Sequence, residues 1–301
     1  METFFSFLER RVDDCSSLLC VGLDPHVSDL AAPTAAAALD FCLKLVKQTA
    51  PFAAAFKPNA AFFEQFGADG WSALKEVIAA VQNESNRRGS MIPVVLDAKR
   101  GDIASTAEAY AISAFETLGA HCITLSPYLG KDSIDPFIQV REKGVFLLCK
   151  TSNPGAADLQ DVLVMEDPSL TLKVGSGPTT GQAPSVLGPQ SSVPLYIHVA
   201  RLAQRWNTGN NIGLVVGATQ LEALARVRAA AAQLWFLAPG VGAQGGDLEA
   251  ALQAGLRADG KGMLIPVSRA ISRAADPAGA AAELRDQILE IRAQKTRKGD
   301  Q

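Results

Sequence analysis

The sequence has few of the side chains that usually hold transition metals. It contains three histidines, at positions 26, 121 and 198, and they are too far apart to form a zinc or di-iron motif. Its five cysteines include no CxxC pair, the spacing found in zinc ribbons and in redox-active disulfides. Three of the cysteines lie in apolar, strand-like runs, so we expect buried, reduced thiols. The sequence therefore predicts no metal site and favours a reducing compartment.

The sequence also lacks any concentration of charge and any long apolar run. Its 28 basic and 31 acidic residues give a net charge of -3 with no basic block, which argues against nucleic acid as a main partner. Acidic residues and arginines interrupt the short aromatic run in residues 1–14, so this stretch has no signal-peptide core. No apolar stretch is long enough to cross a bilayer. We therefore expect a cytoplasmic protein that binds no membrane.

Eight short apolar runs alternate with alanine-rich stretches of helical period. We expect strands over residues 18–23, 52–57, 92–97, 121–126, 145–150, 212–217, 234–239 and 262–267. Helices are expected over 35–49, 71–88, 103–118, 219–231 and 279–295. Continuous hydrophobicity suits parallel strands that are covered on both faces. The alternation predicts an α/β fold, a TIM-type (β/α)8 barrel formed by residues 1–301 as a single domain, with the active site at the carboxyl ends of the strands.

One segment after the fifth predicted strand breaks this alternation. Residues 161–174 are expected to form two short strands around an Asp-Pro turn. Residues 175–194 contain no charge and are rich in Gly, Pro, Ser and Thr, which is typical of a flexible insertion. A helix over 195–207 is expected before the sixth strand. We therefore predict a barrel with an insertion at 175–194.

Charged side chains gather where the third predicted strand ends. Asp97 and Lys99 share one side of an extended segment by the two-residue period of a strand. Lys57, which ends the second predicted strand, would be their neighbour across the sheet. Asp102 follows, and its simplest interpretation is the N-cap of helix 103–118. Because buried ion pairs seldom add much net stability, a network of two lysines and two aspartates favours catalysis over a purely structural role.

The segment after the seventh predicted strand has a G-x-G-x-x-G pattern at Gly240, Gly242 and Gly245. In a dinucleotide-binding fold this pattern follows the first strand, so its place here argues against that function. In a barrel, the loops after strands seven and eight commonly bind phosphate through backbone N–H groups. Gln244 and Arg269 would add side-chain donors to such a site. The alternative for Arg269 is a surface ion pair.

Small polar side chains follow the fifth and first predicted strands. Thr151, Ser152 and Asn153 precede a Pro-Gly turn, where they either contact a heterocycle or only shape the turn. Asp24 precedes Pro25 and either binds a sugar hydroxyl or begins a turn. The residues themselves leave both alternatives open.

The motifs together resemble one known family. In family order the chain contains VGLDP, FKPNAAFFEQFG, LDAKRGDIASTAEAY, TLSPYLGKDSI, CKTSNPG, APGVGAQGGD and PVSRAI. It resembles the orotidine 5'-phosphate decarboxylases, and most closely their longer bacterial branch with DAKRGDI. The D-x-K-x-x-D pattern is shared with a superfamily that includes a sugar-phosphate decarboxylase, but its combination with the strand-two lysine and the late Gln/Arg pair is specific. The resemblance implies conversion of orotidine 5'-phosphate to UMP, the last step of de novo pyrimidine synthesis, without a metal or organic cofactor.

The resemblance also implies a role for each catalytic candidate. Lys99 would donate a proton to C6 of the pyrimidine, and Asp97 would lie against the departing carboxylate. Lys57 and Asp24 would hold the ribose hydroxyls and the array of charges. Ser152 would contact the pyrimidine.

The remaining candidates are implied to bind the phosphate or to act across a subunit interface. Gln244 and Arg269 match the family's phosphate ligands. Asp102 and Thr106 match residues that the family supplies from the other subunit of a homodimer, so the resemblance implies shared sites.

Three other functions remain as alternatives. A metal-dependent decarboxylase or aldolase for an open sugar phosphate would use the same barrel but need a further carboxylate ligand and Mg²⁺. An aldolase that forms a Schiff base on Lys57 or Lys99 is disfavoured, because flanking carboxylates keep a lysine protonated. A non-catalytic barrel that binds nucleotide phosphates would have little use for four clustered charges.

Overall fold

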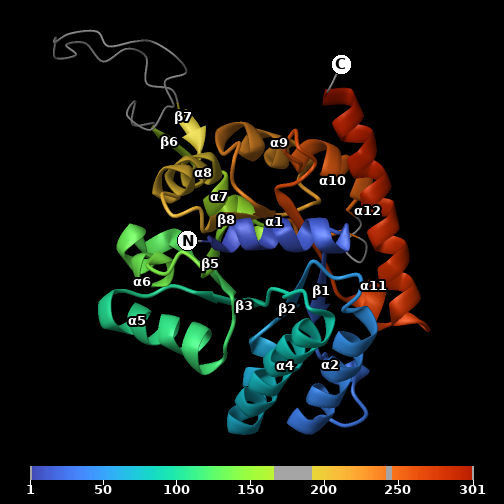
Figure 1. Ribbon diagram of the computed structural model, residues 1–301. Helices are drawn as coiled ribbons and strands as arrows, with labels where there is room; N and C mark the ends of the chain where they lie inside the picture. The colour runs from blue at the N-terminus through green and yellow to red at the C-terminus, as the bar shows by residue number, and fades with distance from the viewer. Residues whose placement is uncertain (1, 166–191, 242–245, 300–301) are drawn as a thin grey trace, which may run out of the picture.

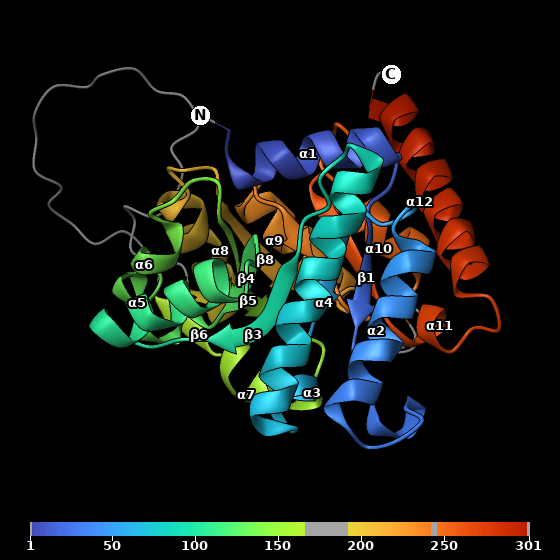
Figure 2. The ribbon, with the colours of Figure 1, turned by 60° about the horizontal axis from the view of Figure 1, so that its bottom comes forward.

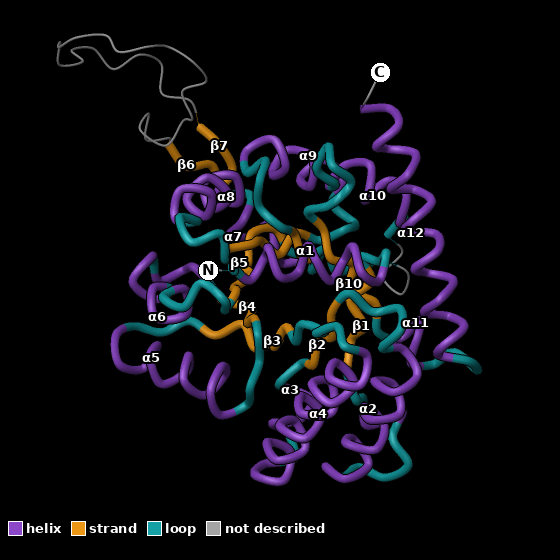
Figure 3. Tube along the Cα trace, in the orientation of Figure 1, coloured by secondary structure: helices purple, strands orange, loops and turns teal. Residues whose placement is uncertain are grey.

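The structure, a computed structural model, describes residues 2–165, 192–241 and 246–299. Over these residues eight parallel strands form one sheet in the order β2-β1-β10-β9-β8-β5-β4-β3. Parallel bridges from Phe56 to Val94 and from Asn59 to Asp97 join the two outermost strands, β2 and β3, and close the sheet into a barrel. Figure 3 shows the strands grouped around the centre of the molecule with the helices outside them. The predicted (β/α)8 barrel is confirmed.

The barrel strands are short and mostly buried on both faces. They are β1 (Leu19–Leu23), β2 (Ala55–Pro58), β3 (Val95–Arg100), β4 (Cys122–Leu125), β5 (Gly144–Lys150), β8 (Ile212–Val216), β9 (Phe236–Leu237) and β10 (Met263–Val267). Every predicted strand overlaps one of these, although β9 keeps only two residues of the predicted six. Charged side chains begin near the carboxyl ends, with Lys57 in β2 and Asp97 in β3. The polar end of the barrel therefore lies where the sequence predicted it.

Helices surround the barrel in alternation with the strands (Figures 1 and 2). The longer ones are α1 (Phe4–Cys15), α2 (Ala35–Thr49), α4 (Gly67–Arg88), α5 (Ala104–Ile112), α8 (Leu195–Trp206), α9 (Leu221–Ala230), α10 (Leu248–Gly255) and α12 (Pro277–Gly299). The four-residue helices are α3 (Ala61–Glu64), α6 (Asp135–Ile138), α7 (Ala157–Gln160) and α11 (Arg269–Ser272). The predicted helices 35–49, 71–88, 195–207, 219–231 and 279–295 correspond to α2, α4, α8, α9 and α12.

Helix α1 crosses the amino-terminal end of the barrel, and the sequence did not predict it as a helix. Thr3 caps it by accepting a hydrogen bond from the Ser6 N–H. Phe5 packs against Trp235, just before β9, and against Phe146 of β5 in the barrel wall. These ring contacts bury the aromatic run and close this end, so ligands have access from the opposite, carboxyl end.

Strand β3 and helix α5 both begin later than the sequence predicted. The strand covers Val95–Arg100 instead of 92–97, and the helix covers Ala104–Ile112 before a π-helical turn at Ser113–Thr117. The N-cap of α5 is Ile103, so the interpretation of Asp102 as the N-cap was wrong. Ile103 is still extended (φ -111°, ψ 156°), which leaves Asp102 one residue too early to cap the helix.

The segment after β5 that breaks the alternation contains a short strand, as the sequence predicted. Strand β6 (Leu163–Met165) pairs antiparallel with β7 (Ser192–Pro194). The other strand predicted there, and residues 175–191 of the predicted insertion, lie outside the described residues. The last three residues of the predicted insertion belong to β7.

Candidate active site

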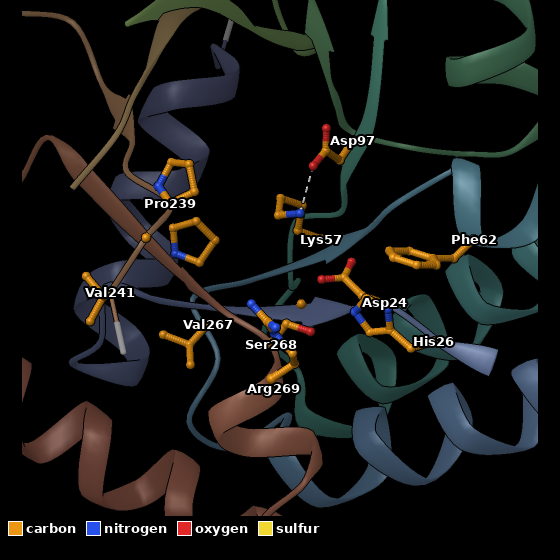
Figure 4. Close-up of a pocket in the computed structure, with 13 residues that line it drawn as sticks. Asp24, His26, Lys57, Phe62, Asp97, Pro239, Val241, Val267, Ser268 and Arg269 are labelled. Atoms are coloured by element: carbon orange, nitrogen blue, oxygen red, sulfur yellow. Dashed lines mark hydrogen bonds and ion pairs between the residues drawn. The ribbon is translucent and has the colours of Figure 1, made fainter. Parts of the chain in front are cut away.

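A cavity of about 340 Å³ lies at the carboxyl ends of the barrel strands (Figure 4). It is lined by Gly22, Asp24, His26, Lys57, Phe62, Asp97, Pro239, Gly240, Val241, Pro266, Val267, Ser268 and Arg269. Gly22 is required for the shape of the cavity, because a Cβ at this position would lie 2.7 Å from the Ser268 Cβ. Four of the predicted site residues, Asp24, Lys57, Asp97 and Arg269, therefore line one cavity.

Asp97 is the centre of a network of charges on the wall of this cavity. Its Oδ2 accepts a hydrogen bond from Lys57 Nζ at 2.9 Å, which Figure 4 shows as a dashed line. Its Oδ1 accepts one from Lys99 Nζ at 2.5 Å. The Asp97 side chain is 12% exposed and that of Lys57 10%, whereas the Lys99 side chain is 51% exposed. One carboxylate thus holds a buried ammonium and an accessible one at the same time.

Lys57 and Asp97 stay ionised despite their burial. Burial by itself would lower the pKa of Lys57, but Asp24 and Asp97 outweigh it and raise that pKa above its ordinary value. Burial would likewise raise the pKa of Asp97, but Lys57 and Lys99 outweigh it and hold that pKa well below the ordinary range. At neutral pH the site therefore presents fixed charges of both signs, with Asp97 as the anion between two lysines.

Two polar atoms of the cavity have no protein partner among the described residues. They are Asp24 Oδ1 and Ser268 Oγ, and both are buried. Buried polar atoms are nearly always hydrogen-bonded, to protein or to water, so such atoms in a cavity favour a polar ligand there. Figure 4 shows the Asp24 carboxylate directed into the space bordered by Lys57 and Ser268. The arrangement suits a ligand that carries hydroxyl groups.

Arg269 borders the same cavity at the start of α11, where its side chain is exposed. The predicted phosphate partner Gln244 lies outside the described residues, as do Gly242 and Gly245 of the glycine pattern. Gly240 adopts a left-handed backbone (φ 115°), and its carbonyl accepts a hydrogen bond from the Gly246 N–H. Gly240 lines the cavity beside Arg269, and this hydrogen bond joins it to Gly246 on the far side of the residues that the structure does not describe.

Asp102 and Thr106 do not join the network in this chain. Asp102 Oδ1 accepts a hydrogen bond from the neighbouring Ile103 N–H at 2.8 Å, and Thr106 is exposed in the first turn of α5. Neither is among the cavity's described lining residues. Asp102 precedes α5, whereas Thr106 lies within it, so the two do not share a face of one helix. Three of the four predicted charges meet within one chain.

Ser152 lies at the carboxyl end of the barrel but outside the described lining of this cavity. It follows β5, and a Cβ on Gly217, at the end of β8, would lie 3.1 Å from the Ser152 Cβ. Its neighbour Thr151 is held by Gln160, whose amide donates to the Thr151 hydroxyl at 2.9 Å. Ser152 is thus close to the strand ends that border the site.

Three residues near the network were not predicted from the sequence. His26 and Phe62 line the cavity with their rings in edge-to-face contact, 4.3 Å between centroids. Thr124 of β4 donates a hydrogen bond to Asp97 Oδ1 at 3.1 Å. His26 follows the Asp-Pro pair and could have been found as a residue after a strand end. Thr124 lies inside an apolar strand, where nothing in the local pattern marks it.

The described residues contain no group of three His, Cys, Asp or Glu side chains placed to hold a metal ion. All five cysteines are buried and free.

Within the same described part of the chain, no helix has both the length and the apolar character needed to span a bilayer.

Comparisons with known proteins place the chain among the orotidine 5'-phosphate decarboxylases. The model of the "Orotidine 5'-phosphate decarboxylase / HUMPS family" matches residues 17–177 and 182–284. An orotidine 5'-phosphate decarboxylase of Roseiflexus castenholzii is 42% identical over 293 residues, which cover 96% of both chains. The solved structure of Leishmania donovani OMP decarboxylase is 52% identical with a TM-score of 0.79, and the match covers 97% of this chain and 99% of that one. The structure of Leishmania donovani UMP synthase is 54% identical with a TM-score of 0.80, and this chain spans 57% of its length.

Proposed function

Because the chain belongs to the orotidine 5'-phosphate decarboxylase / HUMPS family, we propose that it converts orotidine 5'-phosphate to UMP and CO2. The observation that carries the proposal is the charge network of Lys57, Asp97 and Lys99. In it, the Asp97 carboxylate lies between two ammonium groups on the wall of a cavity. The curated relative and the solved structure with that name cover nearly the whole chain. The reaction is proposed to be the last step of de novo UMP synthesis. We further assign the chain to the cytoplasm, where its five free thiols would stay reduced, and treat it as one catalytic domain.

The reaction requires stabilisation of a carbanion. Cleavage of the bond between C6 and the carboxylate releases CO2 and leaves the electron pair on C6, where the ring gives it little resonance relief. A fixed ammonium beside C6 stabilises that pair more than it stabilises the starting carboxylate, and such differential binding accelerates the step. In the proposal Lys99 Nζ then transfers its proton to C6 to give UMP. Its exposed side chain supports reprotonation from solvent.

Asp97 has two functions in this scheme. It holds Lys99 and Lys57 in place through its two carboxylate oxygens. It also places a negative charge beside the substrate carboxylate, which favours departure of CO2. Since the pKa of Asp97 is held low by the two lysines, this charge persists at neutral pH.

The rest of the substrate would be bound away from the reacting carbon. Asp24, whose Oδ1 has no partner among the described residues, and Lys57 are proposed to bind the ribose hydroxyls. Arg269 and Gln244 are proposed to bind the phosphate, and Ser152 the pyrimidine. Binding energy from these remote groups helps to hold C6 against Lys99.

We further propose that the enzyme is a homodimer with shared active sites. Asp102 and Thr106 lie outside the cavity of their own chain, and the neighbouring Ile103 and Ile112 of the α5 region are each 51% exposed. An apolar surface of this kind suits an interface with a second copy, which would bring Asp102 and Thr106 to the partner's cavity.

The test is an assay of orotidine 5'-phosphate absorbance with EDTA present, on the wild type and on Lys99→Ala. Metal-independent loss of absorbance is expected for the wild type. Lys99→Ala should lose nearly all turnover while UMP binding remains measurable, because the ammonium acts chiefly on the carbanion.

Two outcomes would contradict the proposal. Turnover that EDTA abolishes and Mg²⁺ restores would favour the metal-dependent sugar-phosphate alternative. A Lys99→Ala kcat above about a tenth of the wild-type value, a cost of only ~1.4 kcal/mol, would remove Lys99 from its assigned role.

A further inference from the structure

Thr124 forms hydrogen bonds with three consecutive residues of β3, including Asp97 and Lys99. It lies in β4 and is 2% exposed. Its hydroxyl donates to Asp97 Oδ1 at 3.1 Å and accepts from the N–H groups of Ala98 at 3.1 Å and Lys99 at 3.0 Å. A hydroxyl has one proton to donate and two lone pairs to accept. The Thr124 hydroxyl therefore makes all three of its possible hydrogen bonds with residues of β3.

The backbone of β3 needs such a partner, because it departs from regular pairing at this point. Leu96 pairs with Ile123 and Arg100 pairs with Leu125, so β3 advances four residues where β4 advances two. Lys99 takes a left-handed conformation (φ 47°) in this bulge, which costs a residue with a Cβ roughly 1 kcal/mol. The ladder carbonyls of a regular strand pair cannot serve the Ala98 and Lys99 N–H groups here, and the Thr124 oxygen takes their place.

The bulge determines the position of the Lys99 ammonium. Asp97 and Lys99 are two residues apart, and the left-handed turn at Lys99 brings its Nζ to 2.5 Å from Asp97 Oδ1. The same Oδ1 receives the Thr124 hydroxyl, while Oδ2 receives Lys57. The three donors together leave the carboxylate little freedom to rotate.

We propose that Thr124 is a positioning residue, which fixes the Asp97 carboxylate and the bulge at Lys99 so that the ammonium is held at the reacting carbon. Thr124 is not among the described lining residues of the cavity, so it acts through Asp97 and Lys99. The inference rests on the proposed function, in which Lys99 protonates C6. Misplacement of a catalytic group by about 1 Å can cost ~100-fold in rate, so a small shift of Lys99 is enough to matter.

The experiment compares Thr124→Val, which keeps the shape and removes the hydroxyl, with Thr124→Ser, which keeps the hydroxyl. Thr49→Val is the matched control, because Thr49 is also fully buried and its hydroxyl donates to the Leu45 carbonyl at 2.7 Å in α2. For each variant kcat, KM, the Kd for UMP and the melting temperature are measured.

Thr124→Val should lower kcat by at least about 30-fold, while KM and the Kd for UMP stay within about threefold, because Thr124 forms its hydrogen bonds with β3 and not with the residues proposed to bind the ribose and phosphate. Thr124→Ser should keep kcat within about threefold of the wild type. Thr49→Val should lose some thermal stability and keep its kcat. A purely structural role for Thr124 would lower the melting temperature in both valine variants without separating their kcat values.

The inference is overturned if folded Thr124→Val keeps its kcat, or if Thr124→Ser is as slow as Thr124→Val. If Thr124→Val does not fold, Thr124→Cys replaces it, because a thiol of similar size is a weak donor and a weak acceptor. Normal kcat in Thr124→Cys would then overturn the inference. Failure of the proposed function gives a different pattern, since wild type would not turn over orotidine 5'-phosphate or Lys99→Ala would remain active.

Discussion

At the scale of single residues, the site depends on how charges are distributed around one carboxylate. Lys57 is buried and contacts Asp97 Oδ2, while Lys99 is half-exposed and contacts Oδ1. A buried lysine suits a permanent electrostatic role, whereas an accessible lysine can give up a proton and regain it from water. The difference in exposure therefore supports Lys99, rather than Lys57, as the proton donor in the proposed reaction.

His121 is a residue whose ionisation should affect stability rather than chemistry. Its Nδ1 accepts a hydrogen bond from the Val94 N–H at 3.1 Å, its ring lies beside Phe7, and burial together with Lys143 lowers its pKa to about 4. The folded pKa lies below the unfolded value of about 6.5, so the unfolded chain binds the proton more strongly. Stability should therefore fall as pH falls from about 6.5 towards 4, by about 2 kcal/mol at pH 5.

The measurement is the free energy of unfolding in urea at pH 7 and pH 5. His121→Asn is the matched variant, because an Asn oxygen can take the place of Nδ1 as acceptor without titrating. The loss between pH 7 and pH 5 should be smaller in the variant by about 2 kcal/mol. An equal loss in both proteins would show that His121 does not titrate as assigned.

At the scale of elements, Arg228 of α9 joins several segments at one end of the barrel. It donates hydrogen bonds to the carbonyls of Leu234 at 2.7 Å, Gly255 at 2.8 Å and Gly262 at 2.9 Å, and its guanidinium lies 3.6 Å from the Phe236 ring centroid. These carbonyls belong to the entry to β9, the end of α10 and the entry to β10. One side chain thus supports two strands that line the cavity at their other ends.

Arg228→Leu should destabilise the fold by roughly 3 kcal/mol, because several partly buried carbonyls lose a charged donor. Arg226→Leu, two residues earlier on the same helix, is the control. Its ion pair with Glu222 is 3.8 Å long and exposed, and such pairs contribute about 0–1 kcal/mol. Urea unfolding of both variants checks the difference, and similar losses in the two would contradict the assigned role of Arg228.

The elements that the sequence predicted correctly are those defined by local pattern. Buried parallel strands are continuous apolar runs, and helices α2, α4, α8, α9 and α12 carry a clear helical period, so their positions were predictable. Helix α1 was missed because its aromatic residues are interrupted by charges, and its stability comes from rings such as Trp235 that are distant in sequence. Tertiary packing, rather than local helix propensity, therefore stabilises α1.

The candidate site was predictable only in part for a similar reason. Asp24, Lys57, Asp97 and Arg269 each follow or end a strand, and the barrel brings all such positions to one end. The bulge at Lys99 was not predictable, since it depends on a hydroxyl of Thr124 on the next strand. The alternative interpretation of Asp102 as an N-cap was wrong, because sequence patterns do not fix the first residue of a helix to within one position.

At the scale of the whole molecule, Asp102 is not among the described residues that line the cavity of its own chain. That residue and Thr106 lie beyond the bulge, in the α5 region that also exposes Ile103 and Ile112, each at 51%. If this surface meets a twofold axis, each subunit lends Asp102 and Thr106 to its neighbour. The cavity of each chain would then be completed only in the dimer.

A complementation experiment tests the shared site. Chains with Lys99→Ala and chains with Asp102→Ala are each expected to be inactive, and mixing them should restore activity. In a mixed dimer one site collects both defects and the other collects neither. With random reassortment of equal amounts, half of the dimers are mixed and each has one intact site, so about a quarter of wild-type activity is expected for a closed twofold pair. Subunit exchange is verified with differently tagged chains; if exchange occurs and the mixture stays inactive, Asp102 acts within its own chain and the shared-site model is wrong.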